Sequence, residues 1–334
     1  MNLNTLLKHT SRSLYLSVKM LPRSIRSAFG MAYLLCRYAD TIADTQLLAP
    51  DKRLYWIEQF PTIVRTQDAA QEKHLVQALT GTSENPYEKE LISHLADCLT
   101  ALNQIEKSQK QFIYDVVQAV CDGMKIDLAT FSRGTTAAPA VFKRVEDLTH
   151  YCRLMGGKPG LFWSQLIFHS HPVKLPQEKF YELGQHIGDA LQIVNVLRDL
   201  PKDLSSGRCY FPQEQLATQS LSAVELLNKN NSLRFEPVKQ YWLNWGKKNL
   251  QHAVAYFRAI PKTAWRTRAA VAWPVLWTAD TFYKLANCTD LLDVSKRVKI
   301  SRSRIYLTMC VTPFLLISNR IFAGWLTHKL NKLA

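Results

Sequence analysis

The chain has 334 residues, of which 47% are hydrophobic and 21% are charged, so it can bury one large core or two smaller ones. Its net charge is +15, yet no nucleic-acid-binding module accompanies the basic residues, and we expect no nucleic-acid partner. Seven cysteines without Cys-x-x-Cys spacing exclude a disulfide scaffold and a zinc site, and they are typical of a reduced, cytoplasmic protein. Helical patterns dominate and no linker or repeat is visible, which predicts an all-α fold.

The first informative stretch is an apolar helix with one polar face. Tyr33, Arg37, Asp40 and Asp44 are spaced by 4, 3 and 4 residues, so they fall within an arc of about 60° on a helix. Most of their neighbours are apolar. An ordinary Arg37–Asp40 ion pair would explain part of this face, so the stretch alone does not establish a site.

Two segments further along are expected to interrupt the helices. Residues 66–86 are polar and predict a surface loop. Gly156, Gly157 and Pro159 predict a break with accessible backbone, because glycine and proline weaken helices.

A second polar stripe follows, with the same design. Gly188, Gln192, Asn195, Asp199 and Asp203 lie within an arc of about 80° of a helix that is otherwise apolar. A polar stripe on a buried helix costs free energy unless something satisfies it. Pro201 lies between the two aspartates and predicts a kink, so the position of Asp203 depends on how the helix accommodates the proline.

The two Asp-x-x-x-Asp pairs together are stronger evidence for a functional site than either pair alone. With 15 Asp in 334 residues, chance alone predicts about one such match. Two carboxylate pairs on helices that face each other can hold Mg²⁺ ions, and Mg²⁺ characteristically binds a few carboxylates together with substrate phosphates. The pattern therefore favours an enzyme that acts on a diphosphate.

The C-terminal part combines charge and hydrophobicity. Residues 295–304 are rich in Lys and Arg, and 13 uncharged residues, 305–317, follow. Thirteen residues are too few to span a bilayer. Two interpretations stay open: a helix that lies on the membrane surface, and a helix that packs on the core with exposed basic residues.

Several motifs, in order along the chain, make it resemble the squalene/phytoene synthase family over roughly residues 5–300. They are Ser11-Arg12-Ser13, Met20-Leu21-Pro22, Tyr33 to Asp44, Gly123-Met124-Lys125-Ile126-Asp127-Leu128, Tyr151 to Gly160, Leu191 to Asp203, and Gly207 to Pro212.

This resemblance implies a single-domain isoprenoid-synthase helical bundle around a central cavity over residues 1–300, followed by a helical extension, 301–334. It implies head-to-head (1′–1) condensation of two isoprenyl diphosphates. The metal ligands it implies for Mg²⁺ are Asp40, Asp44, Asp199 and Asp203. The residues it implies around the reacting carbons and the diphosphate are Tyr33, Tyr151, Arg37 and Arg198, together with Ser11, Arg12, Ser13, Gln192, Asn195 and Arg208.

The product is less constrained than the reaction class. The Asp-Thr-Ile-Ala-Asp form of the first motif and the 207–212 segment favour squalene synthase, with farnesyl diphosphate as substrate and NADPH as reductant. Dehydrosqualene, phytoene and hydroxysqualene formation without NADPH stay as alternatives. No dinucleotide-binding glycine motif is present, but squalene synthases bind NADPH without one. A non-catalytic, membrane-associated relative is less favoured, since all four aspartates are present. We expect a monomer that associates peripherally with the membrane.

Overall fold

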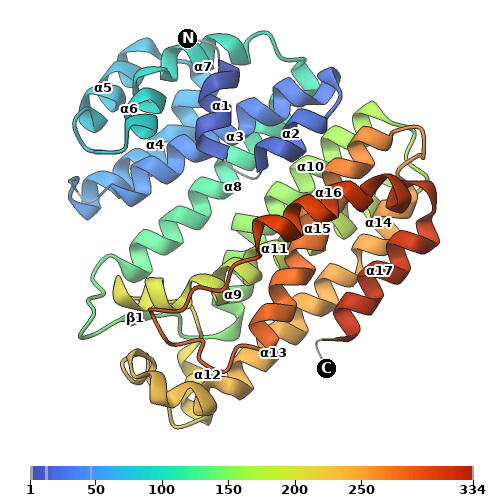
Figure 1. Ribbon diagram of the computed structural model, residues 1–334. Helices are drawn as coiled ribbons and strands as arrows, with labels where there is room; N and C mark the ends of the chain where they lie inside the picture. The colour runs from blue at the N-terminus through green and yellow to red at the C-terminus, as the bar shows by residue number, and fades with distance from the viewer. Residues whose placement is uncertain (1–2, 12–13, 46, 333–334) are drawn as a thin grey trace. The chain divides into compact units, whose positions relative to one another are not determined.

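The structure, a computed structural model, describes residues 3–11, 14–45 and 47–332 (Figure 1). Its elements are nearly all helices, which confirms the predicted all-α fold. The chain forms two compact units. The first comprises Met1–Ala129 and Gln165–Ser170, and the second comprises Thr130–Ser164 and His171–Ala334.

The first unit is built from the N-terminal helices. These are α1 (Leu3–Ser11), α2 (Leu14–Met20), α3 (Arg23–Asp44), α4 (Pro50–Thr66), α5 (Ala69–Leu79), α6 (Pro86–Ser93), α7 (Leu95–Leu102) and α8 (Lys107–Phe131), whose last two residues belong to the second unit. The expected loop over 66–86 is therefore largely wrong, because α5 occupies its middle. Asp68 starts this helix by accepting hydrogen bonds from the backbone N–H groups of Ala70 (2.8 Å) and Gln71 (3.1 Å).

Helix α3 forms the centre of the first unit. It starts directly after Pro22, which cannot itself donate to the helix, and buries a row of apolar residues. Tyr38 stacks on Phe60 of α4, with ring centroids 5.2 Å apart. At the other end, buried Arg53 donates a hydrogen bond to the carbonyl of Ala43 (3.0 Å) and thereby satisfies one of the carbonyls left open at the helix end. The end of α3 is thus fixed in place.

The second unit holds the remaining elements. They are β1 (Ala140–Val141), α9 (Val145–Cys152), the π-helical turn η1 (Arg153–Gly157), α10 (Lys158–Ser170), α11 (Gln177–Ser205), β2 (Arg208–Cys209), α12 (Gln213–Thr218), the 3₁₀ turns η2 (Glu225–Leu227) and η3 (Lys229–Asn231), α13 (Ser232–Gln251), α14 (Ala253–Ala259), α15 (Trp265–Ala286), α16 (Arg302–Ile317) and α17 (Asn319–Asn331). Strands β1 and β2 form one short parallel pair. Residues 165–170 of α10 belong to the first unit.

Glycines allow α11 to pack closely against η1 and α10, which precede it in the chain. A Cβ atom at Gly188 would lie 2.0 Å from the carbonyl oxygen of Gly156, and one at Gly160 would lie 2.2 Å from that of Gly184. Only glycine permits this approach of two backbones. The predicted break at Gly156-Gly157 is wrong: the chain passes from α9 through η1 into α10 without leaving helical structure. The glycines serve close packing here.

Pro201 does not end or divide α11. The helix continues through it to Ser205, although proline lacks the N–H that would bond to Leu197. Both Leu197 and Pro201 are buried, so tertiary packing holds the backbone where local preference opposes it. Asp203 therefore lies on the same helix as Asp199, one turn further on.

The last two helices are fastened to α15 and α14 by polar and aromatic contacts. The buried carboxylate of Asp280 on α15 accepts two hydrogen bonds from Arg304 of α16 (3.0 and 3.1 Å) and also pairs with Lys329 of α17. Phe322 of α17 stacks on Phe257 of α14, with centroids 3.8 Å apart. In the described part of the chain, no helix has the length and apolar character needed to cross a membrane.

Candidate functional site

The polar face of α3 is held by contacts with α1 and α6. The Tyr33 hydroxyl donates a hydrogen bond to the carbonyl of Thr10 on α1 (2.7 Å). Arg37 is shared between two carboxylates, Asp40 at 3.5 Å and Glu88 of α6 at 2.9 Å. Glu88 lies far from α3 in the sequence, and no motif pointed to it. It fixes the guanidinium of Arg37 beside the first acidic pair.

The carboxylate of Asp40 is in an unusual electrostatic environment. The surrounding protein atoms raise the pKa of Asp40 to about 7, Arg37 opposes this rise, and the neighbouring carboxylates of Asp44 and Glu88 add to it. The side chain nevertheless remains 36% exposed. The raised pKa of Asp40 shows that an added cation beside this carboxylate would be stabilised.

The polar stripe of α11 is formed as the sequence predicts. Gln192, Asn195, Asp199 and Asp203 are all half-buried, and they lie along one helix. Arg198 forms a two-point ion pair with Asp199, at 3.0 Å from Nε and 2.5 Å from Nη2. A two-point pair of this kind is stronger and better oriented than a single contact.

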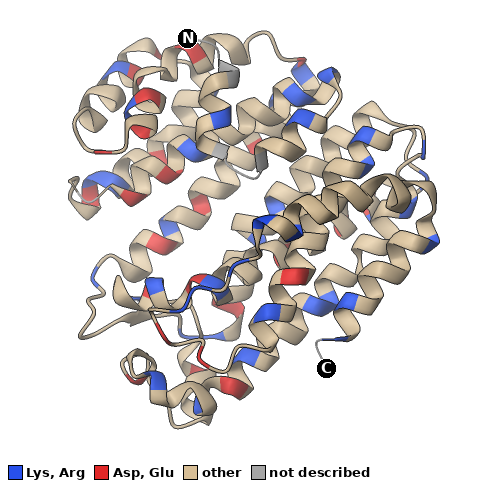
Figure 2. Ribbon diagram, in the orientation of Figure 1, with Lys and Arg blue, Asp and Glu red and all other residues tan. Residues whose placement is uncertain are grey.

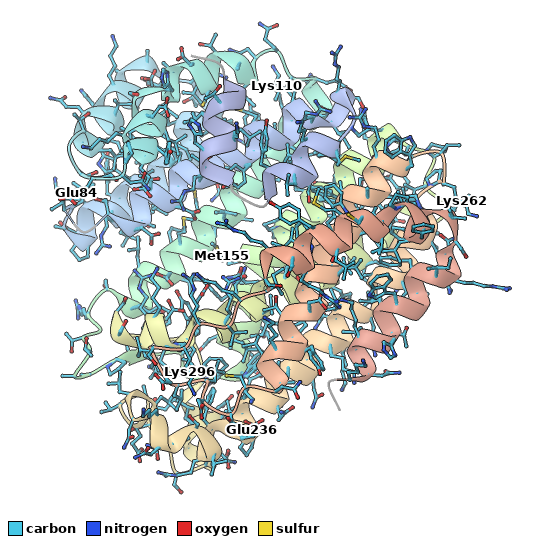
Figure 3. The ribbon with its side chains drawn as sticks, viewed as in Figure 1. Glu84, Lys110, Met155, Glu236, Lys262 and Lys296 are labelled. Atoms are coloured by element: carbon cyan, nitrogen blue, oxygen red, sulfur yellow. The ribbon has the colours of Figure 1, made fainter. Side chains whose placement is uncertain are left out.

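A further cation near the polar stripe of α11 comes from a segment that the sequence did not connect with the site. Arg297, in the segment between α15 and α16, places its guanidinium 3.8 Å from the carboxylate of Asp199. Its neighbour Lys296, labelled in Figure 3, pairs with Asp290 in the same segment. The sequence assigned these side chains to a basic, outward-facing stretch. Two of them instead bind carboxylates of their own unit, and Arg297 joins the residues around Asp199.

Both acidic pairs lie near the C-terminal ends of their helices. Asp44 is the last residue of α3, and Asp203 lies two residues before the end of α11. The C-terminal end of a helix carries the negative end of its dipole, so carboxylates there are destabilising by roughly 0.3–1 kcal/mol each when exposed, whereas cations are favoured. No basic residue occupies the last turn of α3. The last turn of α11 does contain a basic residue, Lys202, so the negative potential is greatest at the end of α3.

The donor set fits Mg²⁺ bound together with a phosphate ligand. Among the described residues, no group of three or more His, Cys, Asp or Glu side chains is placed to hold a metal ion. Each helix instead offers a pair of carboxylates, and Mg²⁺ is commonly held by one or two carboxylates with substrate phosphates completing its shell. The stripes of α3 and α11 belong to different units, and each fits this description by itself.

Tyr151 lies in an aromatic cluster of the second unit. Its ring stacks on Tyr210 at 5.1 Å and lies 5.8 Å from that of Phe142. Phe131 completes the cluster at 4.8 Å from Tyr210 and 4.9 Å from Phe142. Tyr151 itself is buried. Tyr210 and Phe142 were not assigned roles from the sequence, although Tyr210 stands within the 207–212 segment that carries part of the resemblance.

The remaining predicted residues are placed as follows. Arg208 is half-buried in β2, the strand that follows α11. Ser11 is the last residue of α1. Arg12 and Ser13 lie outside the described residues. Their predicted roles stay predictions.

The comparisons with known proteins point in one direction. The family model described as squalene/phytoene synthase matches residues 7–304. A bifunctional lycopene cyclase/phytoene synthase of Arthroderma gypseum is 26% identical over 247 residues, covering 71% of this chain and 38% of that protein. A presqualene diphosphate synthase of Rhodopseudomonas palustris is 28% identical over 213 residues, covering 64% of this chain and 62% of that protein. The chain thus matches less than two thirds of the length of either relative.

A solved structure shows the same fold. The complex of TcSQS, a squalene synthase, with the ligand BPH1237 superposes with a TM-score of 0.79 at 17% sequence identity, covering 99% of this chain and 96% of the other. At this identity the likeness establishes the architecture alone.

Proposed function

Because the chain belongs to the squalene/phytoene synthase family, whose members are head-to-head isoprenoid synthases, we propose that it condenses two farnesyl diphosphates through presqualene diphosphate. The product we propose is squalene, with NADPH as the reductant of the second half-reaction. The observation that carries the proposal is the pair of Asp-x-x-x-Asp stripes, each near the C-terminal end of a largely buried helix.

The four aspartates, Asp40, Asp44, Asp199 and Asp203, would hold Mg²⁺. Bound Mg²⁺ neutralises the charge that develops on a departing diphosphate. The carboxylates contribute negative charge near two helix ends, where the helix dipole also favours a cation.

The arginines have a second task in this proposal. Arg37 and Arg198 now neutralise the aspartates beside them. When cations take over that role, the same guanidinium groups are released to donate hydrogen bonds to diphosphate oxygens, for which their planar fork is well suited. Glu88 and Arg297 belong to this arrangement as positioning residues, since each contacts one member of an Arg–Asp pair.

The aromatic cluster around Tyr151 would serve the carbocation. Ionisation of an allylic diphosphate leaves a positive charge that water quenches, so the surroundings must be apolar. The rings of Phe131, Phe142, Tyr151 and Tyr210 exclude water from their part of the second unit, and aromatic faces attract cations. The role we propose for Tyr151 is to present its ring to the reacting carbons.

We propose that the protein acts as a cytoplasmic monomer at a membrane surface. Its seven cysteines all carry free thiols, as a reducing compartment requires. The substrates and products of the proposed reaction are lipids, which a peripheral enzyme can exchange with a bilayer.

A product assay tests this function. Purified protein is incubated with farnesyl diphosphate and Mg²⁺, with and without NADPH, and the organic extract is analysed by mass spectrometry. Squalene formed only in the presence of NADPH supports the proposal. A product distribution that ignores NADPH shows dehydrosqualene or phytoene chemistry, and no consumption of farnesyl or geranylgeranyl diphosphate refutes the reaction class.

Aspartate variants test the site itself. Asp40→Asn and Asp199→Asn should each lower turnover by about 100-fold or more, since each removes a charge that holds the cation opposite the leaving group. Asp115→Asn, which changes an exposed carboxylate of α8, is the matched control. The stabilisation that Mg²⁺ with inorganic diphosphate gives to the thermal midpoint should also be lost in the two site variants. Wild-type turnover in either of them would remove its aspartate from the metal site.

A further inference from the structure

The outer face of α16 is apolar and uncovered. Tyr306 is 62% exposed, Leu307 47%, Phe314 65% and Ile317 65%. At about 100° per residue these four positions fall within an arc of about 100°, so they form one continuous face of the helix. This set, together with Ile321 at the start of α17, is called the α16 outer face below; Ile321 is 46% exposed.

The opposite side of α16 fixes the helix in this orientation. Thr312 accepts a hydrogen bond from the indole N–H of Trp273 (2.7 Å), and Leu315 is fully buried. Arg304 adds its two hydrogen bonds to Asp280. Because these contacts lie on the inner side, α16 cannot turn to bury its outer face without breaking all of them. In Figure 1, α16 runs alongside α15.

The charged residues of the segment that contains the α16 outer face are all basic. No Asp or Glu occurs from Val294 to the end of the chain, and Figure 2 shows α16 and α17 without an acidic residue. Among the described residues, Lys299 and Arg302 before the face and Arg320 near its other end form no ion pair, and all three are exposed. Four other cations of the segment already pair with carboxylates, namely Lys296, Arg297, Arg304 and Lys329. The face therefore has an apolar centre and unpaired positive charge at both ends.

We propose that the α16 outer face docks on an anionic lipid bilayer, with Phe314 and Ile317 inserted at the headgroup boundary; this inference rests on the membrane association proposed above and names the surface that would make it. Helices that lie in this interface have large apolar side chains flanked by Lys or Arg, and the cations meet the anionic headgroups. A stable contact with a second copy of the chain buries about 800 Å² on each partner, from some 20–30 residues a side. Five apolar side chains do not supply such a surface, whereas insertion into lipid needs no complementary protein.

Vesicle flotation tests this proposal with the full-length protein. The protein is mixed with vesicles of phosphatidylcholine alone, or with added phosphatidylglycerol, and floated through a sucrose gradient. We expect binding to the anionic vesicles that weakens at high salt, with little binding to phosphatidylcholine alone. Wild-type protein that floats with neither vesicle overturns the proposal.

Two sets of variants separate the apolar and the charged contributions. Phe314→Gln combined with Ile317→Gln should abolish flotation. Arg302→Gln combined with Arg320→Gln should weaken it by roughly 25-fold, since each cation at an anionic surface contributes about fivefold. Leu233→Gln is the matched control, because Leu233 is an apolar residue of α13 that is 82% exposed but lies outside the α16 outer face.

Two further measurements separate lipid docking from misfolding and from self-association. Circular dichroism and thermal unfolding should be unchanged in all these variants, because they alter exposed side chains. Light scattering coupled to size exclusion decides whether a second copy covers the face instead. A dimer that the Phe314/Ile317 double variant dissociates, without vesicle binding by the wild type, would refute lipid docking. Because flotation requires no turnover, it is independent of the product assay.

Discussion

Replacing Gly188 by alanine should loosen the contact that positions α11. The new Cβ would lie 2.0 Å from the carbonyl oxygen of Gly156, whereas ordinary van der Waals contact begins at 3.4 Å. The obstructing atom belongs to the backbone, so no side-chain rotation relieves the overlap. The two segments must separate by about 1 to 1.4 Å, and a gap of about 1 Å already removes up to half of the dispersion energy at the contact.

The net effect is a difference between two terms. Overpacking of this kind costs up to about 3 kcal/mol, and the higher helix propensity of alanine returns about 1 kcal/mol. We therefore expect a net destabilisation of about 2 kcal/mol, or a thermal midpoint lower by roughly 3 °C for a chain of 334 residues. Activity should fall as well, since Asp199 stands on the same helix.

Gly324→Ala is the control for this prediction. Gly324 lies in α17, and a Cβ there would meet nothing within 4 Å. The same chemical change should therefore raise stability by up to about 1 kcal/mol through helix propensity alone. Thermal and urea unfolding of both variants provide the measurement. A Gly188→Ala protein as stable as the wild type would show that the two backbones are not in close contact.

Three further substitutions test other contacts. Asp280→Asn leaves the buried Lys329 without its counter-charge and should cost about 3–5 kcal/mol in the free energy of unfolding; an unchanged urea midpoint would contradict the buried pairing. Burial raises the pKa of Asp189 to about 7, so the folded state holds its proton where the unfolded state has lost it, and stability should fall as pH rises from about 4 to 7; Asp189→Asn should flatten this part of the stability–pH curve, and an identical slope in both proteins would refute it. Glu88→Gln should lower kcat/KM about tenfold by releasing Arg37, with the fold unchanged by circular dichroism; wild-type kinetics would remove Glu88 from the site.

Periodicity predicted the helices that carry the acidic pairs, because an apolar surround with one polar stripe at helical spacing is typical of a largely buried helix. Predictions from local sequence preference failed where tertiary packing or capping outweighs that preference. The pair Gly156-Gly157 lowers helix propensity, yet it lies within continuous helical structure, since a close backbone contact outweighs the local cost. The polar composition of residues 66–86 wrongly predicts a loop, because composition alone does not register the cap that Asp68 provides.

The candidate site was predictable where its residues share a helix. Arg37 and Asp40, or Arg198 and Asp199, stand close in the sequence, so their pairing follows from helix geometry. Glu88 and Arg297 reach the same groups from segments 51 and 98 residues away, and no spacing rule reports such contacts. Long-range partners of this kind require coordinates.

The attachment of α16 and α17 to a single carboxylate bears on how this protein can be shortened for expression. A chain ending near residue 300 would keep Asp280 but lose both of its cations, and it would uncover the ring of Phe257. Such a truncation resembles the removal of a loose tail in the sequence, yet it would leave a charge with no partner and an open apolar groove. Precipitation of such a shortened protein would therefore indicate that its core is damaged. For solubility, single polar replacements on the α16 outer face are the better route, because they keep every inward contact.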